Sequence, residues 1–123
     1  MLGDKWSLLI IRDMLFGKKT YTEFANSPEK IASNILADRL KKLEETGIVS
    51  KSKIPGNRKS NKYALTQKGI DLIPVLMEMI VWTDTHIPDH IADFTKEYAA
   101  SYRSNREGTL EKMREQALSF SDN

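Results

Sequence analysis

The 123-residue sequence has no cysteine and only 6 glycines and 4 prolines. The missing cysteine excludes disulfides, a thiolate nucleophile and cysteine-based redox sensing, and it suits a reducing compartment. The longest apolar runs, at residues 8–11 and 72–77, are far shorter than the roughly 18 residues that a membrane helix needs. Because Asp4 and Lys5 follow closely on Met1, we expect no secretory signal. The sequence therefore predicts one globular cytoplasmic domain that makes no membrane contact.

Patterns that would indicate catalysis are also missing. There is no glycine-rich phosphate loop and no histidine–carboxylate triad pattern. The two histidines, His86 and His90, have the spacing of a helical zinc site, but Pro88 between them disfavours a continuous helix. We therefore expect neither an enzyme nor a cofactor or metal, and we interpret the histidines as part of a polar corner.

Positive charge is concentrated in the first half of the chain. Residues 1–65 contain 13 Lys or Arg and 7 Asp or Glu, whereas residues 66–123 contain 6 and 10, so a net charge of only +2 hides two unlike halves. Residues 51–68 contain cations and no carboxylate. These cations are Lys51, Lys53, Arg58, Lys59, Lys62 and Lys68. Such a block is typical either of a solvated basic surface or of a phosphate-binding one.

Three helices are predicted before this block. Asp4 is a suitable cap for a first helix at about 5–16, and Thr20 and Glu23 form a capping box for a short helix at about 21–26. Leucines at helical spacing then predict a third helix at 33–46, which Gly47 ends. A helix, a short helix, a turn and a helix within about forty residues is the arrangement of a helix-turn-helix unit.

Two strands and three further helices are predicted after the third helix. Residues 48–54 and 62–65 flank the turn signal Pro55-Gly56-Asn57, so the cation block would lie on a β-hairpin, or wing, with a loose basic tip. A long helix at about 67–86 would bend at Pro74. We expect helices at about 89–104 and 109–118, and a frayed end at 119–123.

Several segments resemble motifs of the HxlR family of winged helix-turn-helix regulators. Residues 2–12, which include Gly3, Lys5 and Trp6, are similar to its opening motif. The remaining matches are the second helix at Tyr21–Phe24, the recognition helix at Ile35–Glu44, the junction at Tyr63–Gly69 and the following helix at Leu72–Leu76. The resemblance extends from residue 2 to about residue 86.

The sequence departs from this family in two ways. Family members usually carry a further N-terminal stretch with a cysteine that acts as a redox switch in some of them, whereas here Met1 lies five residues before Trp6 and there is no cysteine. Thiol-based sensing is therefore not expected of this chain. Ala32-Ser33-Asn34 replaces the family's serine and proline at the start of the recognition helix, which changes the cap.

The exposed face of the third helix is the candidate base-reading surface, with a merely solvated face as the alternative. Asn34 is suited to adenine, Ala37 to a thymine methyl group and Asp38 to cytosine, with Ser33 beside them. Lys41 would meet a base or a phosphate. The remaining candidates, expected to contact phosphate or the minor groove, are Arg39, Lys42, Arg58, Lys59, Lys18 and Lys19.

The C-terminal helices are rich in large apolar side chains that suit a core, a dimer seam or a pocket for an unidentified small-molecule effector. These side chains are Met77, Met79, Trp82, Phe94, Tyr98 and Tyr102. We expect that one small domain cannot bury two long helices alone, so residues 66–104 would pair with a second copy. The family resemblance implies the same.

The predicted fold is mainly α with a small β-hairpin wing. It comprises a winged helix-turn-helix domain at 1–88 and C-terminal helices at 66–123 that extend it for dimerisation. The predicted function is a sequence-specific transcriptional regulator that binds double-stranded DNA as a homodimer on a pseudo-palindromic operator. Helix 33–46 would enter the major groove and wing 51–62 would lie on the flanking backbone or minor groove. The alternative is a winged-helix module that binds proteins and not DNA.

Overall fold

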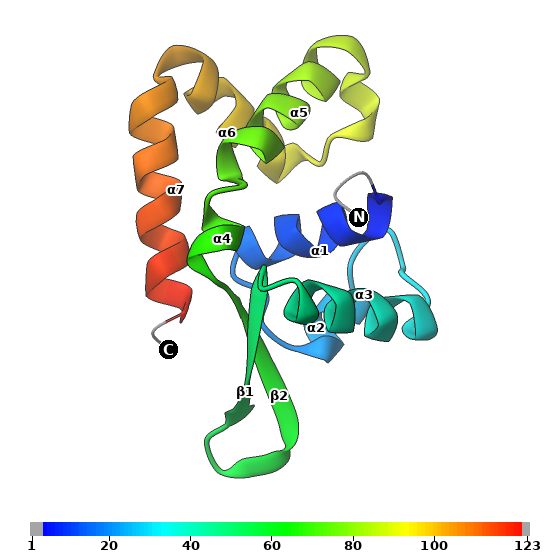
Figure 1. Cartoon of the computed structure of the whole chain (residues 1–123). Helices are drawn as coiled ribbons and strands as arrows, with labels where there is room; N and C mark the ends of the chain where they lie inside the picture. Colours follow the sequence, from blue (N-terminus) through cyan, green and yellow to red (C-terminus); the bar gives the residue numbers. More distant parts are fainter. Residues whose placement is uncertain (1–3, 122–123) are drawn as a thin grey trace.

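The computed structural model describes residues 4–121, apart from the side chains of Arg58 and Ser121, and consists of helices with one hairpin (Figure 1). This confirms the predicted fold class. In chain order the elements are α1 (Lys5–Leu15), α2 (Tyr21–Ala25), α3 (Ser33–Glu45), β1 (Val49–Ile54), β2 (Asn57–Leu65), α4 (Gln67–Ile70), α5 (Ile73–His86), a 3₁₀ turn (Pro88–His90), α6 (Asp93–Ser104) and α7 (Arg106–Ser121).

Local sequence signals define the first two helices. The Asp4 carboxylate accepts a hydrogen bond from the backbone N–H of Ser7 at 3.0 Å and so caps α1. Thr20 and Glu23 form the reciprocal capping box of α2. Gly17, which follows α1, adopts φ +99°, a conformation that glycine tolerates better than other residues. These helix starts therefore agree with the predictions.

The third helix buries an apolar stripe and leaves the rest of its surface open. Leu36, Leu40 and Leu43 are buried against α1 and the hairpin. Ala32 precedes the helix, and no side-chain hydrogen bond caps its first turn. The first turn of α3 therefore depends on contacts from other elements to stay in place.

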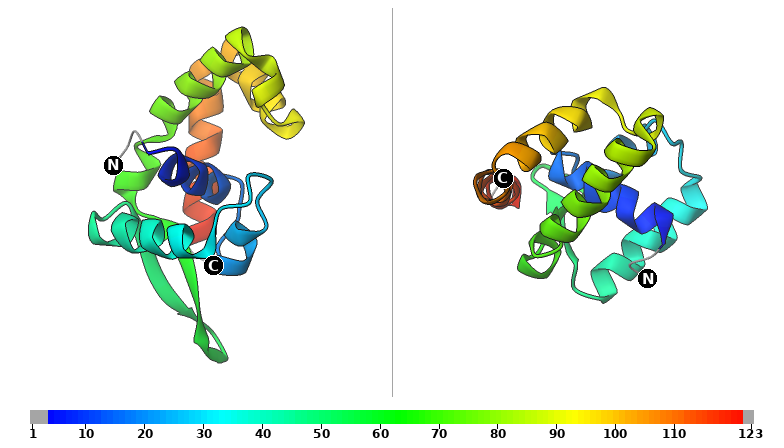
Figure 2. Two further views of the ribbon diagram at one scale, coloured as in Figure 1. Left: turned by 90° about the vertical axis from the view of Figure 1, so that its right-hand side faces the viewer. Right: turned by 90° about the horizontal axis from the view of Figure 1, so that it is seen from above.

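The wing is a two-stranded antiparallel hairpin that projects away from the helices (Figures 1 and 2). Val49 pairs with Leu65 at its base, and the register shifts near the tip between Lys53 and Ile54. Strand β2 begins at Asn57 rather than at the predicted Lys62, so the tip is a tight turn and not a loose loop.

The chain before α2 also joins the hairpin. The backbone N–H of Tyr63 donates to the carbonyl of Lys19 at 2.7 Å, and Thr20 forms a bridge with Lys62. The α1–α2 connection is therefore attached to the outer edge of β2.

The prediction of one long helix at 67–86 was wrong, because the chain forms two helices in this region. α4 ends at Ile70, and α5 starts at Ile73 with Pro74 in its first turn. A proline in a first turn removes no intrahelical hydrogen bond, so Pro74 begins a helix here instead of bending one.

The C-terminal helices also differ from the prediction. A 3₁₀ turn at Pro88–His90 precedes α6, which starts at Asp93 rather than at Asp89. α7 continues to Ser121, so residues 119–121 are helical and not frayed, while 122–123 lie outside the described residues.

One chain buries one side of these helices and leaves large apolar side chains of α5 and α6 exposed, so the expected pairing with a second copy stays a prediction. Ala99, Tyr102, Leu110, Met113 and Ala117 belong to the same hydrophobic core as α1, α3 and the wing base. α7 packs beside α1 and β2, and α6 connects it to α5 (Figure 1). Within residues 4–121, no helix has the length and apolar character needed to cross a membrane.

Gly69 in α4 allows a close approach between helix and wing. A Cβ atom there would lie 2.4 Å from the carbonyl oxygen of Ile48 and 2.9 Å from Cδ2 of Leu65. Alanine usually stabilises a helix relative to glycine, but here the clash with backbone should reverse the sign. We expect Gly69→Ala to lower the unfolding free energy by roughly 2 kcal/mol in urea denaturation. A more stable variant would contradict the close approach.

Candidate nucleic-acid interface

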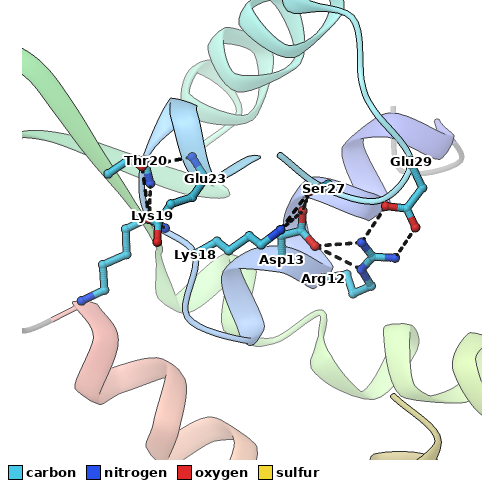
Figure 3. A network of polar contacts seen from close by, with 8 residues as sticks. All are labelled: Arg12, Asp13, Lys18, Lys19, Thr20, Glu23, Ser27 and Glu29. Atoms are coloured by element: carbon cyan, nitrogen blue, oxygen red, sulfur yellow. Dashed lines mark hydrogen bonds and ion pairs between the residues drawn. The ribbon is translucent and has the colours of Figure 1, made fainter. Parts of the chain in front are cut away.

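A polar network holds α1 against the turn between α2 and α3 (Figure 3). The Arg12 guanidinium donates to both carboxylate oxygens of Glu29 at 2.8 and 2.9 Å and to Asp13 at 2.8 Å. Asp13 is 5% exposed and also accepts a hydrogen bond from the Ser27 hydroxyl. Burial disfavours the charged form of Arg12, yet its bonds to Glu29 and Asp13 raise its pKa above the ordinary value. The network therefore ties the helix-turn-helix together.

The two lysines before α2 have different surroundings. The Lys18 ammonium donates to Ser27 at 3.2 Å and lies 3.7 Å from Asp13, so it belongs to the network. Lys19 makes no ion pair among residues 4–121, and its ammonium lies 5.7 Å from the centre of the Phe120 ring of α7 (Figure 3 shows both lysines). The backbone N–H of Lys19 donates to Glu23 at 2.9 Å, but within the described residues its ammonium has no carboxylate partner.

The open face of α3 gathers four of the predicted site residues. Ser33, Asn34, Ala37 and Lys41 are all exposed and follow one another at helical spacing. Lys41 has no carboxylate partner within the described part of the chain. This face presents a hydroxyl, an amide, a methyl group and a free cation, which are groups that can read base edges.

Three other predicted residues of α3 bind one another on its flank. Arg39 donates to Asp4 at 2.8 Å and to Asp38 at 2.7 Å, and Lys42 lies 3.2 Å from Asp38. Hydrogen bonds from Lys42 and Arg39 lower the pKa of Asp38 below its ordinary value. The Asp38 carboxylate therefore already has two cationic partners, and Arg39 joins α3 to the start of α1.

The wing carries exposed cations along its length. Lys59 near the tip and Lys53 on β1 are exposed and have no carboxylate partner among the described residues. Lys51 lies 3.7 Å from Glu44 of α3. The side chain of Arg58 lies outside the described part of the structure. The wing tip thus presents positive charge beyond the end of the helical body.

Two grooves border the wing, one on its α3 side and one on its α2 side. One, of about 340 Å³, lies between α3 and the wing base, where Ala37, Lys41 and Lys51 are among its lining residues. The other, of about 400 Å³, lies between α2 and the outer wing and includes Lys59. Tyr21 lines both grooves. Sequence reasoning missed Tyr21, although an exposed aromatic beside the capping box was a signal that could have found it.

The histidines form no cluster suited to metal binding. Within the described residues, no group of three or more His, Cys, Asp or Glu side chains could hold an ion. His86 instead lies beside Trp82, with 4.9 Å between ring centres. This part of α5 is therefore a surface of aromatic rings.

A helix-turn-helix followed by a basic hairpin defines the winged helix-turn-helix class. Residues 1–91 match the HxlR-like helix-turn-helix family, and the chain belongs to this family. Family members are transcriptional regulators and not enzymes.

Relatives with names and structures agree with this assignment. The HTH-type transcriptional regulator YodB of Bacillus subtilis is 37% identical over 84 residues, covering 68% of this chain and 75% of YodB. The structure of its reduced form matches with a TM-score of 0.59 at 34% identity, covering 73% of this chain and 88% of that one. PA1607, a putative transcription factor, matches with a TM-score of 0.66 at 35% identity, covering 75% of this chain and 61% of that one.

The ion pair between Asp4 and Arg39 should make stability depend on pH. Arg39 and the Ser7 amide hold the pKa of Asp4 well below its ordinary value. A lowered carboxyl pKa contributes stability that is present above about pH 4 and lost as the pH falls toward the lowered pKa. Asp4→Asn keeps a capping side chain but removes the charge. We expect wild type to have the higher Tm at pH 7, with a difference that narrows below about pH 4.

An Arg39→Met background provides the control for this measurement. There the Asp4 carboxylate has lost its cationic partner, so adding Asp4→Asn to this background should change the Tm little at pH 7. A difference between wild type and Asp4→Asn that stays constant from pH 7 to pH 3 would contradict the ion-pair account.

Proposed function

We propose that this regulator binds double-stranded DNA with α3 in the major groove and the wing on the flanking backbone or minor groove. The observation that carries the proposal is the continuous surface from the open face of α3 to the wing, which includes Lys41 and Lys59 and lies on the cation-rich half of the chain. Phosphate contacts supply most of the affinity of such a surface and base-edge contacts supply its specificity.

The chemistry of the individual side chains supports different roles. Asn34 is suited to adenine and Ala37 to a thymine methyl group, with Ser33 able to bond either base edges or phosphate. Lys41, Lys59 and Lys19 have no carboxylate bound to their ammonium groups within residues 4–121 and are suited to phosphate. Asp38 and Arg39 act through their ion pairs, which orient α3 on α1. Lys42 reaches phosphate only by leaving Asp38, and Lys18 only by leaving Asp13.

The regulator acts as a homodimer in this proposal. Val75, Met79 and Trp82 lie on one face of α5 and are exposed, Trp82 by 57%. Their spacing of four and three residues makes a stripe of the kind that a second helix covers. Two copies related by a two-fold axis would bring two α3 helices to successive major grooves about 34 Å apart, which suits a pseudo-palindromic operator. Residues 1–88 would then read DNA while 66–123 hold the dimer.

A cytoplasmic location and a small-molecule effector complete the proposal. A groove of about 450 Å³ between α6 and α7 has mixed polar and apolar walls and a volume within the range of ligand sites. Tyr98, one of its lining residues, also packs against Phe16 at the end of α1, with 4.8 Å between ring centres. An occupant of this groove would therefore touch a residue that contacts the reading domain.

Salt dependence tests the DNA interface. The logarithm of affinity for a fragment of the chain's own promoter region should fall linearly with the logarithm of salt concentration. Lys41→Ala and Lys59→Ala should each reduce the slope by about 1, because each removes one phosphate contact. Lys112→Ala on α7 is the matched control and should leave the slope unchanged. Salt-independent binding, or none, would favour the protein-interaction alternative.

A charged substitution on the exposed stripe tests the dimer. Trp82→Glu places a carboxylate where the second copy would pack, so we expect a monomer by analytical ultracentrifugation and a loss of operator affinity of roughly tenfold or more. Leu118→Glu on α7 is a control of similar exposure, since Leu118 is 47% exposed and lies off the stripe. A Trp82→Glu protein that remained dimeric would exclude this interface.

A further inference from the structure

Tyr21 occupies a central position on the candidate interface. It is the first residue of α2, it is 37% exposed, and it lines both the α3–wing groove and the α2–wing groove. Its aromatic side chain shares the first groove with Ala37 and Lys41 and the second groove with Lys59. Tyr21 therefore lies between the two elements that are proposed to contact DNA.

The hydroxyl of Tyr21 is bonded to the recognition helix itself. It donates to the backbone carbonyl of Ser33, the first residue of α3, at 3.0 Å. The side chain of Ala32 accepts no bond from the free N–H groups of the first turn, and the Tyr21 hydroxyl does not replace that cap, but it attaches the turn to α2 through the Ser33 carbonyl. The connection before α3 is irregular as well, since Lys30 has φ +51°. Tyr21 thus supplies a side-chain tie at the end of α3 that lacks a cap of its own.

We propose that Tyr21 is a positioning residue for sequence recognition, which rests on the proposed DNA-binding function. Its hydroxyl fixes the first turn of α3, and that turn carries Ser33 and Asn34, two of the side chains proposed to meet base edges. A bidentate bond from an amide to adenine requires a well-defined helix start, because a small displacement separates its donor and acceptor from the base. Phosphate contacts by flexible lysines do not have this requirement.

The wing-side contacts of the ring are separate from this role. Removing only the hydroxyl leaves the ring in both grooves, so Tyr21→Phe changes the tie to Ser33 and little else. The bond lies at the surface, where its loss leaves a carbonyl that water can reach, and the fold should be retained. Tyr21→Phe therefore tests an effect on sequence recognition without changing the stability of the fold or the charge of the protein.

The experiment compares the affinity of wild type and Tyr21→Phe for the promoter fragment and for a random duplex of equal length. We expect affinity for the promoter fragment to fall roughly three- to tenfold, the range expected for one hydrogen bond, while affinity for the random duplex and the salt slope stay the same. Thermal denaturation should show an unchanged Tm. Ser119→Ala on α7 removes an exposed hydroxyl that also donates to a backbone carbonyl, that of Gln116, and should change none of these values.

A double-mutant cycle with Asn34→Ala identifies the route. If Tyr21 acts through the first turn of α3, adding Tyr21→Phe to Asn34→Ala should have little further effect on promoter affinity. Additive effects of the two substitutions would overturn the proposal. An equal loss of affinity for both duplexes, or a reduced salt slope, would also overturn it, because each result means that Tyr21 contacts phosphate or supports the fold. Wild-type protein that binds neither duplex would overturn the proposed function as well.

Discussion

The buried carboxylate of Asp13 is the constraint on which the helix-turn-helix depends. It lies in α1, accepts from Arg12 and from Ser27, and so connects α1 with the turn before α3. Glu29 completes the arrangement from the same turn. A charge buried to this degree is stable only while its partners remain in place, so α1 and the turn must move together. This attachment therefore fixes where the turn delivers the chain into α3.

Ion pairing divides the cations of the first half into two groups. Arg12, Lys18 and Arg39 bond to carboxylates and hold helices together, whereas Lys41 and Lys59 face solvent without such partners within the described chain. The first group gives the domain its shape, and the second gives it its outward charge. Because pairing removes cations and carboxylates together, the excess of cations in residues 1–65 is carried by the unpaired group.

Local signals were sufficient to predict where the first two helices begin and where the hairpin turns. The Asp4 cap, the capping box at Thr20 and the turn at Gly56 each depend on residues only a few positions apart, and each was found as expected. The break before Pro74 was missed because a proline fits both a bent helix and a new one, and tertiary packing decides between them. The contacts of Lys18 with Asp13 and Ser27, and the hydrogen bond from Tyr21 to α3, depend on partners that no local sequence pattern reveals.

The packing of α7 beside α1 joins segments about a hundred residues apart, and the aromatic ring of Phe120 covers Gly17 at the end of α1. Contacts with such sequence separation form late, because closing a long loop costs entropy before any contact compensates it. During synthesis, α1 therefore leaves the ribosome well before its partner exists. The core that α1 shares with α7 therefore reaches its final packing only after residue 120 has emerged.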